Sequence, residues 1–485
     1  MLRTKKLMDN LSQFNTDEIK TYIEQYWEDQ IIPSLSEYIS IPNKSPLFDP
    51  DWEKNGYMED AVSHIMAWVE SQSVAGLHAE VHRITGKTPT ILLTLEPIQP
   101  AENCLNVLIY GHLDKQPEFD GWHADLAPFT PVRKDNLLYG RGGADDGYAI
   151  YSAVAALKYL TVKSIAHPRI VILIEASEES GSPDLAAYMD KLEPVIGDPD
   201  LVIALDSTCG NYDQLWLTTS LRGMLIADLG VRVLEEGVHS GAAGGIVPSS
   251  FRILRQLISR IEDEETGNIK PSFLNDQVPE KRRQEAIEAA KILADSFADM
   301  YPFSGDTQPV SSDPVELVLN NTWMPSLAVT GIGGVPEPEQ AGNVLRPETR
   351  ARLALRIPPT TDALEAASQL KALVTATPPN GATVSFDMHT PNPGWHAPIL
   401  NKKLDQLLNQ VSGAFYGKPM AAMGCGGSIP FMEFLAHRSP KAQFVVTGIL
   451  GPHSNAHGPN EFLHIPAAKK LTMCVTAMLQ SWGAT

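Results

Sequence analysis

CLNVLIYGHLDKQP, residues 104–117, combines a buried strand with a polar ending. Its apolar run, LNVLIY, has the length and composition of a strand that is covered on both faces of a sheet. The run stops at Gly111, and His112 and Asp114 follow with one residue between them. An imidazole and a carboxylate at the end of a strand often only stabilise a turn through side-chain hydrogen bonds. Whether these two do more depends on the rest of the chain.

Strands of the same kind alternate with helices along the first part of the chain. Apolar runs predict strands within residues 88–97, 168–182 and 200–207, and amphipathic runs predict helices over residues 148–162 and 184–195. Buried strands separated by helices are typical of an α/β fold with a mostly parallel sheet that helices cover on both faces. We therefore predict a fold of this class.

The pattern changes near residue 216. Residues 215–236 predict one long strand with alternating apolar positions, and further strands and helices of an α+β kind follow it. The α/β pattern resumes after residue 390. Since 485 residues exceed the roughly 250–300 at which single cores stop growing, we predict two domains. Residues 1–215 and 391–485 would form one domain, and residues 216–390 would form an inserted α+β sandwich.

Composition excludes several classes of partner. The chain has 38 Lys and Arg against 58 Asp and Glu, a net charge of −20, so neither nucleic acid nor an anionic membrane is expected as a partner. No stretch approaches the ~18 apolar residues that span a bilayer, and the first 20 residues lack the apolar run of a secretory signal. The four cysteines are scattered without a C-x-x-C pair, so we expect a protein of the reducing cytoplasm.

Carboxylates and imidazoles follow one predicted strand after another. Each cluster alone has a structural explanation, as a turn, a helix N-cap or a complement to a helix dipole. Functional groups of an open α/β sheet, however, gather at the carboxyl ends of its strands. The residues concerned are His112, Asp114, Asp145, Asp146, Glu178, Glu179, Asp206, His453 and His457.

Together these residues predict a metal site. Carboxylates that lie close together must hold protons or bind cations. Imidazoles and carboxylates without cysteine suit zinc, or else manganese or cobalt. Five or more ligands are too many for one tetrahedral zinc ion but fit two ions bridged by a carboxylate. One Glu of an adjacent pair can then ligate while the other acts as a general base. The residue types indicate a two-metal hydrolase without assigning the individual roles.

Four motifs resemble those of a known family. They are G-H-x-D at 111–114, G-R-G-x-x-D-D at 140–146, E-E-S-G at 178–181 and A-H-x-x-N-E at 456–461. The order and types are similar to the di-metal metallopeptidase and amidohydrolase family of carnosinases, dipeptidases, glutamate carboxypeptidases, aminoacylases and succinyl-diaminopimelate desuccinylase. The dipeptidase and carnosinase branch is the most similar. The resemblance implies an aminopeptidase-like catalytic domain with an inserted lid and dimerisation domain.

The resemblance also implies a set of metal ligands. His112 would ligate one metal ion and His457 the other, Asp145 would bridge the two ions, and Glu179 and Asp206 would each complete one of them. Zinc is the expected metal, with manganese and cobalt as alternatives. In the family a cis peptide bond typically follows the bridging Asp.

Three further residues take catalytic roles by resemblance. Glu178 would be the general base toward a metal-bridging water, and Asp114 would hydrogen-bond the imidazole of His112. His239 would stabilise the oxyanion from the partner subunit of a homodimer, although a turn residue beside Gly241 is the alternative. One departure is Gly147, which stands where the family usually has Lys.

Residues that would bind substrate come from the inserted domain and from a late glycine-rich loop. By resemblance, Asn343 and Arg356 would bind the substrate's C-terminal carboxylate or the oxyanion, and Gly427 and Ser428 would donate hydrogen bonds to that carboxylate. For Arg356 the alternative is an ordinary charge on a surface strand.

These inferences predict a hydrolase that cleaves a peptide or amide bond in dipeptides or small peptides with a free C-terminal carboxylate. An N-acyl amino acid amidohydrolase or a glutamate carboxypeptidase-type enzyme is the alternative within the family. A catalytically silent binding protein on the same fold is the alternative from another class. The latter would be expected to lack Glu178 or a metal ligand, and none is missing.

Overall fold

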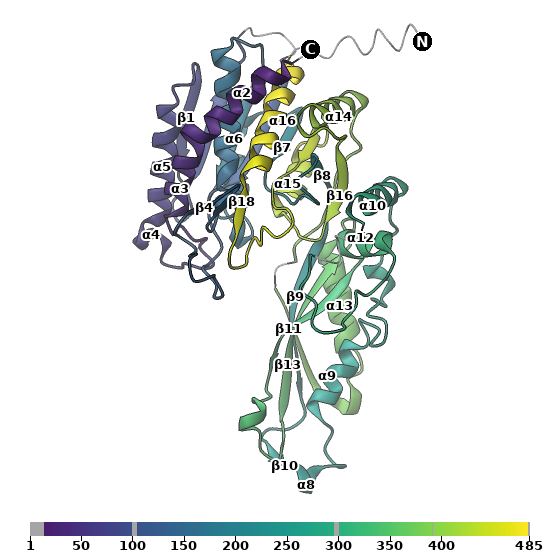
Figure 1. Ribbon diagram of the computed structural model, residues 1–485. Coiled ribbons are helices and arrows are strands. Elements are labelled where there is room, and N and C mark those ends of the chain that lie inside the picture. The colour runs from purple at the N-terminus through teal and green to yellow at the C-terminus, as the bar shows by residue number, and fades with distance from the viewer. Residues whose placement is uncertain (1–13, 99–103, 295–299, 390, 484–485) are drawn as a thin grey trace.

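A broad α/β body and an elongated arm that projects from it make up the described part of the chain (Figure 1). The computed structural model describes residues 14–98, 104–294, 300–389 and 391–483. The predictions on the N-terminal segment therefore fall largely outside the described residues. Within those residues, no helix is both long and apolar enough to cross a membrane.

A six-stranded sheet forms the centre of the body. β3 runs parallel to its neighbours β6 and β7, and β17 runs parallel to β7. β2 is antiparallel to both of its neighbours, β6 and the edge strand β1. The predicted mostly parallel α/β sheet is confirmed. In spatial order the strands are β1 (Leu77–His82), β2 (Thr90–Leu95), β6 (Arg169–Glu175), β3 (Asn106–His112), β7 (Leu201–Ala204) and β17 (Gln443–Val446).

Helices cover both faces of this sheet, which explains the continuous apolar run of β3. Val107 and Ile109 pack into the core on one face, and Leu108 and Tyr110 pack into the core on the other. All seven residues of β3 are buried as a result. Around the first face lie α2 (Thr16–Tyr26), a π-helical turn (Trp27–Ile31), α3 (Ile32–Ile39), α5 (Tyr57–Ser71), α6 (Tyr148–Val162), α14 (Lys402–Tyr416) and α16 (Ile465–Gly483), and on the second lie α7 (Leu185–Ile196) and α15 (Pro430–Arg438).

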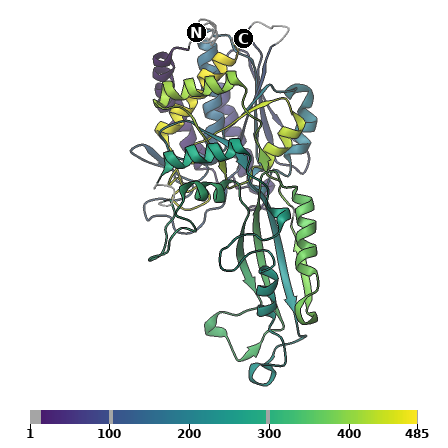
Figure 2. The same cartoon turned by 90° about the vertical axis from the view of Figure 1, so that its right-hand side faces the viewer.

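The arm is an antiparallel sheet with helices on one face, as Figure 2 shows from the side. Alternate residues of β13, among them Leu353 and Leu355, point into the core beneath these helices. The short strands β10 and β12 pair at the far tip, next to α8 (Figure 1). The elements are β11 (Ser326–Gly333), β13 (Glu348–Ile357), β9 (Gly223–Arg232), β14 (Thr383–Met388), α9 (Ser250–Ile258), α13 (Ala363–Thr375), β10 (Val238–His239), β12 (Val344–Leu345) and α8 (Ser240–Ala243).

The single long strand predicted over residues 215–236 is wrong, because the chain changes sheets at Arg222. β8 (Trp216–Leu221) pairs with β15 (Trp395–His396) and β16 (Ala421–Cys425), whereas β9 belongs to the arm. Between them the buried Arg222 guanidinium donates Nη1 to the carbonyls of Asn320 and Met324 at 3.1 and 3.0 Å, and Nε to the Gly426 carbonyl at 3.3 Å. The side chain thus holds the junction of body and arm.

Smaller elements complete the body. β18 pairs with β5, and β5 pairs with β4, in a separate sheet. α10 and α12, which come from the predicted insert, pack against β16, and the division of the chain at residues 216 and 390 stays a prediction. These elements are α4 (Trp52–Asn55), β4 (Val132–Lys134), β5 (Leu137–Tyr139), β18 (Phe462–His464), α10 (Glu280–Leu293) and α12 (Pro314–Thr322).

Replacing Arg222 tests the junction. In Arg222→Met the carbonyls that it serves lose a charged donor, and we expect the free energy of unfolding to fall by about 2–4 kcal/mol, measured by urea denaturation. Arg352→Met is the matched control on the exposed face of the arm, where the ion pair with Asp228 is half exposed, and we expect a loss below about 1 kcal/mol. Equal losses in the two variants would contradict the assignment.

Candidate metal centre and active site

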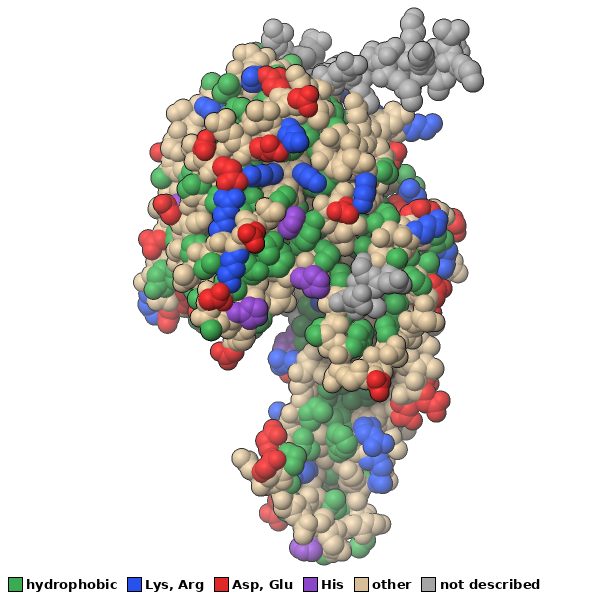
Figure 3. Space-filling view, viewed as in Figure 1, with side chains coloured by type: hydrophobic (Ala, Val, Ile, Leu, Met, Phe, Trp, Pro, Cys, Tyr) green, Lys and Arg blue, Asp and Glu red, His purple; other side chains and the backbone are tan. Residues whose placement is uncertain are grey.

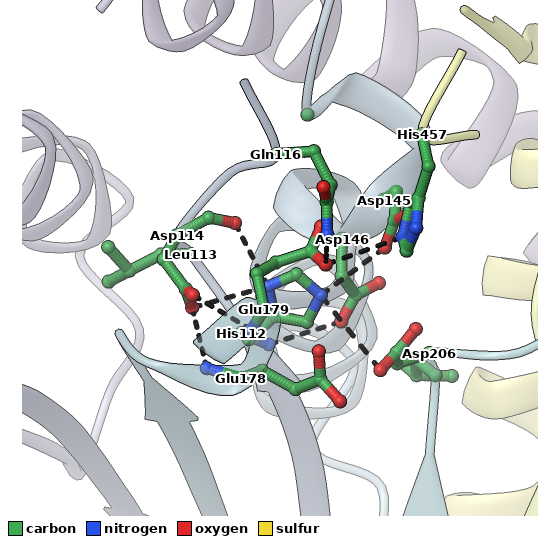
Figure 4. A network of polar contacts seen from close by, with 12 residues as sticks. His112, Leu113, Asp114, Gln116, Asp145, Asp146, Glu178, Glu179, Asp206 and His457 are labelled. Atoms are coloured by element: carbon green, nitrogen blue, oxygen red, sulfur yellow. Dashed lines mark hydrogen bonds and ion pairs between the residues drawn. The ribbon is translucent and has the colours of Figure 1, made fainter. Parts of the chain in front are cut away.

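Parallel strands bring the predicted metal ligands to one edge of the central sheet. His112 is the last residue of β3 and lies opposite Glu175, the last residue of β6. Glu178 and Glu179 follow β6 in a short 3-10 turn, and Asp206 follows β7. The carboxyl ends of these strands therefore deliver imidazole and carboxylate groups to the same place, as Figure 4 shows.

Asp145 lies between the two imidazoles. Its Oδ1 is 3.3 Å from His112 Nε2, and its Oδ2 is 3.0 Å from His457 Nε2 (Figure 4). One carboxylate oxygen thus faces each histidine, which is the arrangement that a carboxylate bridging two ions requires. The peptide bond from Asp145 to Asp146 is cis, as the resemblance implies.

Of the other two carboxylates in the predicted ligand set, one lies near each histidine. Glu179 Oε2 lies 3.3 Å from His457 Nε2, and Asp206 Oδ2 lies 3.9 Å from His112 Nε2. Potential ligand atoms of His112, Asp145 and Glu179 lie within 4.8 Å of one another, and so do those of His112, Glu178 and Asp206. Glu178 therefore lies close enough to the cluster to ligate, as well as to act as a base.

Burial makes these carboxylates costly without a cation. It raises the pKa of Glu178 and Glu179 well above the usual value, and the neighbouring charges of Asp206 and Asp145, respectively, add to the effect. Burial likewise raises the pKa of Asp206 to about 6. Glu179 Oε1 is buried and has no hydrogen-bond partner among the described residues. Oxygen and imidazole donors without a thiol fit divalent ions such as zinc, manganese or cobalt.

Asp114 supports both halves of the cluster. Its carboxylate accepts hydrogen bonds from the backbone N–H groups of Glu178 and Glu179, at 3.1 and 3.0 Å. His112 Nδ1 lies 3.5 Å from Asp114 Oδ1 and 3.1 Å from the Asp114 carbonyl oxygen. His112 Nδ1 therefore faces both the side chain and the backbone carbonyl of Asp114. The Asp114 side chain also fixes the turn that carries Glu178 and Glu179.

Sequence reasoning missed a buried ion pair that holds the metal-binding loops. Arg141 and Glu461 form this pair, and both are almost fully buried. Glu461 Oε1 also accepts a hydrogen bond from Gly142 N, and Arg141 Nη2 donates to the Gly458 carbonyl. The loop before Asp145 is thereby fastened to the loop of His457. Arg141 lies in the G-R-G-x-x-D-D motif and Glu461 in the A-H-x-x-N-E motif. The presence of one opposite charge in each motif was the signal that could have predicted the pair.

Gln116 is a second residue that the sequence did not single out. Its Nε2 donates to Glu179 Oε2 at 2.6 Å. The bond fixes the orientation of a carboxylate whose other oxygen has no partner, and it leaves that oxygen available to a cation. Nothing in the types or spacing of neighbouring residues distinguishes Gln116, so only the fold reveals this contact.

The structure explains the departure at Gly147. A Cβ at this position would overlap the ring of Tyr38 and the Gly142 carbonyl. The buried Lys115 ammonium lies 4.0 Å from the centroid of the Tyr38 ring and donates to the Tyr38 and Ile41 carbonyls. An aromatic ring and a lysine from elsewhere in the chain thus occupy the space beside the Asp pair.

The predicted substrate residues fall into two groups. His239 and Asn343 are exposed, and Ser240 N donates to the Asn343 carbonyl at 2.9 Å. β10, which ends at His239, lies at the tip of the arm in Figure 1, whereas β7, which precedes Asp206, lies in the body. His239 Nδ1 accepts from Gly241 N and Ala242 N, so it does cap a turn. The structure does not bring these two residues to the metal ligands of the same chain.

Arg356 and the glycine-rich loop form the second group, near the junction of body and arm. Arg356 is half-buried on β13, and its Nη1 has no partner among the residues that the structure describes. Burial lowers the pKa of Arg356, and nearby Cys425 partly offsets this. Gly427 N lies 3.4 Å from Cys425 Sγ, and Ser428 follows. In Figure 3 the surface is hollowed between the body and the arm.

The sheet edge and its carboxylate and imidazole cluster define a metal-dependent hydrolase. The sequence profile of the peptidase family M20/M25/M40 matches residues 108–481, and the chain belongs to this family. The predicted family is thus confirmed, and the protein is a hydrolase that depends on divalent metal. The profile covers all four motifs on which the resemblance rested.

Similar proteins include named dipeptidases. A cysteinylglycine-S-conjugate dipeptidase of Corynebacterium striatum is 26% identical over 470 residues, covering 94% of this chain and 96% of the relative. A Beta-Ala-His dipeptidase of Rattus norvegicus is 24% identical over 355 residues, covering 71% and 70%. The structure of the dipeptidase Dug1p of Saccharomyces cerevisiae has a TM-score of 0.76 at 20% identity, covering 97% and 99%. That structural likeness supports the fold.

A glycine-to-alanine pair tests the crowding beside the Asp pair. In Gly147→Ala the new methyl group displaces Tyr38, and we expect the free energy of unfolding to fall by about 1–3 kcal/mol, with weaker binding of divalent metal. Gly413→Ala is the control, since no atom lies within 4 Å of a Cβ at this exposed position of α14. Alanine there should raise stability by about 0.5–1 kcal/mol. Urea denaturation measures the stability of both variants, and metal titration measures their affinity for divalent metal. A Gly147→Ala protein as stable as the Gly413→Ala control would contradict the account.

Proposed function

We propose that the protein is a two-metal dipeptidase that cleaves the peptide bond next to a free C-terminal carboxylate. The observation that carries this proposal is the position of Asp145, with one carboxylate oxygen facing His112 and the other facing His457. The relatives named as dipeptidases support the substrate class. Zinc is the metal that the donor set favours, with manganese and cobalt as alternatives.

Each metal would be held by a small set of residues. His112 and Asp206 would hold one ion, His457 and Glu179 the other, and Asp145 both. When bound, such ions lower the pKa of a water and polarise a carbonyl oxygen. The side chain of His457 is 55% exposed, so this side of the cluster is open to a substrate.

Glu178 would move the proton. It should take a proton from the attacking water and deliver it to the amine that leaves, because its carboxyl lies beside the ligands in a buried site. Burial, together with the charge of Asp206, favours the protonated form of Glu178 that the second transfer needs. The hydrogen bond from Glu178 N to Asp114 holds the turn in place during both transfers.

Arg356, Gly427 and Ser428 would bind the carboxylate of the substrate. Arg356 is half-buried with an unpartnered Nη1, and a guanidinium with free donors is well suited to a carboxylate. The loop of Gly427 is tied to Arg222 through the Gly426 carbonyl. This hydrogen bond would hold the carboxylate-binding loop at a fixed position relative to the arm.

His239 would act on the neighbouring subunit of a homodimer that forms through the arm, with Asn343 beside it. β11 is one of the two edge strands of the arm sheet, and its Val329 and Ile332 are exposed, which favours pairing with a second copy. Burial of that edge would allow the tip of one arm to approach the cluster of the other subunit. For location we propose the cytoplasm, because the four cysteines of the described structure are free thiols.

Glu178→Gln tests the general base. We expect kcat for dipeptides to fall by about 10²–10⁴-fold, while metal content, measured by elemental analysis, stays at the level of the unchanged protein. Glu70→Gln, on the exposed face of α5, should leave kcat unchanged. Loss of metal together with activity would assign Glu178 as a ligand, and full activity would exclude it from the reaction.

Metal removal tests the cofactor. Exhaustive chelation should abolish hydrolysis of a panel containing X-Gly dipeptides, β-Ala-His, N-acyl amino acids and folyl-type glutamates. Zinc, manganese or cobalt should then restore it, and dipeptides should be cleaved faster than the acylated compounds. Hydrolysis that survives complete removal of metal would contradict the mechanism, and preference for acyl amino acids would contradict the substrate class.

A mixture of two inactive variants tests whether His239 acts across subunits. His239→Ala and Glu178→Gln should each be nearly inactive alone. In mixed dimers one site combines an intact Glu178 with an intact His239 from the partner, so an equal mixture should recover about a quarter of full activity. Mixing Glu178→Gln with a chain that carries both substitutions should recover none. Absence of recovery in the first mixture, with dimers present by light scattering, would contradict action in trans.

A further inference from the structure

A cavity of about 250 Å³ lies in the body, outside the metal cluster. Its walls come from β8, β16, the first turns of α10 and α14, and the segment that joins β15 to α14. Its apolar lining residues include Leu217, Ile399, Met420 and Phe444. No residue to which a role in hydrolysis is assigned above lines this cavity.

The lining also contains a buried pair of charges, Arg282 and Glu285. Arg282 is 6% exposed and donates Nη1 to Glu285 Oε2 at 2.6 Å and Nη2 to the Ala397 carbonyl at 2.7 Å. Thr219 Oγ1 donates to the same Glu285 oxygen at 2.8 Å. Arg282 Nε is buried and has no hydrogen-bond partner within the described part of the chain. A buried guanidinium with an unused donor in a cavity wall is unusual, because unpaired buried donors are costly.

Glu285 also keeps one oxygen for a further partner. Its Oε1 lies 3.7 Å from Lys281 Nζ, too far for a direct hydrogen bond, and Lys281 is mostly exposed. The remaining charges of the wall are Lys402 and Asp405. The cavity therefore offers separate partners for a negative and a positive group, together with apolar lining residues.

We propose that this cavity binds a free α-amino acid with an apolar side chain. The carboxylate would pair with Arg282, the ammonium with Glu285, and the side chain would lie against Leu217, Met420 and Phe444. The volume is below the range of pockets for drug-sized ligands, which suits a ligand of this size. A zwitterion also matches a wall in which cationic and acidic side chains occur together. The proposal goes beyond hydrolysis at the metal centre, and it assigns a second site.

One hydrogen bond between side chains links this second site to the metal cluster. Thr218 lines the cavity, and its hydroxyl lies 2.6 Å from the hydroxyl of Ser207. Ser207 directly follows Asp206, which faces His112 in the metal cluster. A bound amino acid would thus rest on the strand that supports one of the proposed ligands.

Calorimetric titration of the metal-free protein tests the proposal without involving hydrolysis. L-leucine should bind with a stoichiometry of one. Three analogues each lack one part of it: 4-methylpentanoate lacks the ammonium, 3-methylbutylamine lacks the carboxylate, and glycine lacks the side chain. Each should bind at least about tenfold more weakly, since each loses a charged hydrogen bond or apolar burial. Equal binding of leucine and 4-methylpentanoate would overturn the assignment to an amino acid.

Matched variants locate the site. Arg282→Met should weaken leucine binding at least about tenfold, and Arg283→Met, on the exposed side of the same turn of α10, should not. Ala422→Leu narrows the cavity without touching either charge and should also abolish binding, which keeps the test decisive if Arg282→Met does not fold. Absence of leucine binding to the unchanged protein, or unchanged binding in Ala422→Leu, would overturn the proposal. Either result would leave the proposed dipeptidase reaction unaffected, because no metal is present.

Discussion

The crowding of carboxylates at one edge of the central sheet is the constraint on which the rest of the structure depends. Glu178, Glu179 and Asp206 are brought together because β6 and β7 both end beside β3, and Asp145 joins them from the turn Gly143–Gly147, just before α6. Burial and neighbouring negative charges raise the pKa of Glu178, Glu179 and Asp206. Burial also opposes ionisation of Asp145, but its hydrogen bonds with His112 and His457 outweigh this effect and lower its pKa. The fold therefore builds a site that a bound cation would stabilise, and the imidazole of His112 lies among these carboxylates as a further potential ligand.

Much of the surrounding structure keeps this crowded arrangement in place. The Arg141–Glu461 pair fastens two loops, Asp114 holds the turn of the two glutamates, and Lys115 binds the carbonyls at the end of α3. A buried ion pair adds little net stability compared with apolar packing. The Arg141–Glu461 pair instead fixes geometry, because it joins the loop before Asp145 to the loop of His457. The junction at Arg222 extends the same principle from the loops to the arm.

The predictable part of the fold followed from local patterns. The continuous apolar run of β3 indicated a doubly covered strand, and the alternation in β13 matched a sheet with one buried face. The prediction of a single strand over residues 215–236 was wrong. The alternation of apolar residues continues through Arg222, but the strands before and after Arg222 pair with different partners. Strand pairing depends on partners such as β16 and β13, which lie about 200 and 125 residues away along the chain. No local period contains that information.

For the site, the sequence by itself determined the chemistry: the imidazoles, the carboxylates and their positions after strands were sufficient to predict metal and hydrolysis. Tertiary structure alone decided the arrangement. It placed Asp145 between two histidines, joined Gln116 to Glu179, and put Tyr38 against Gly147. It also set His239 at the tip of the arm, away from the cluster of its own chain. The physical reason is that residue types determine which bonds are available, whereas distances between segments remote in sequence are set by packing of the whole chain.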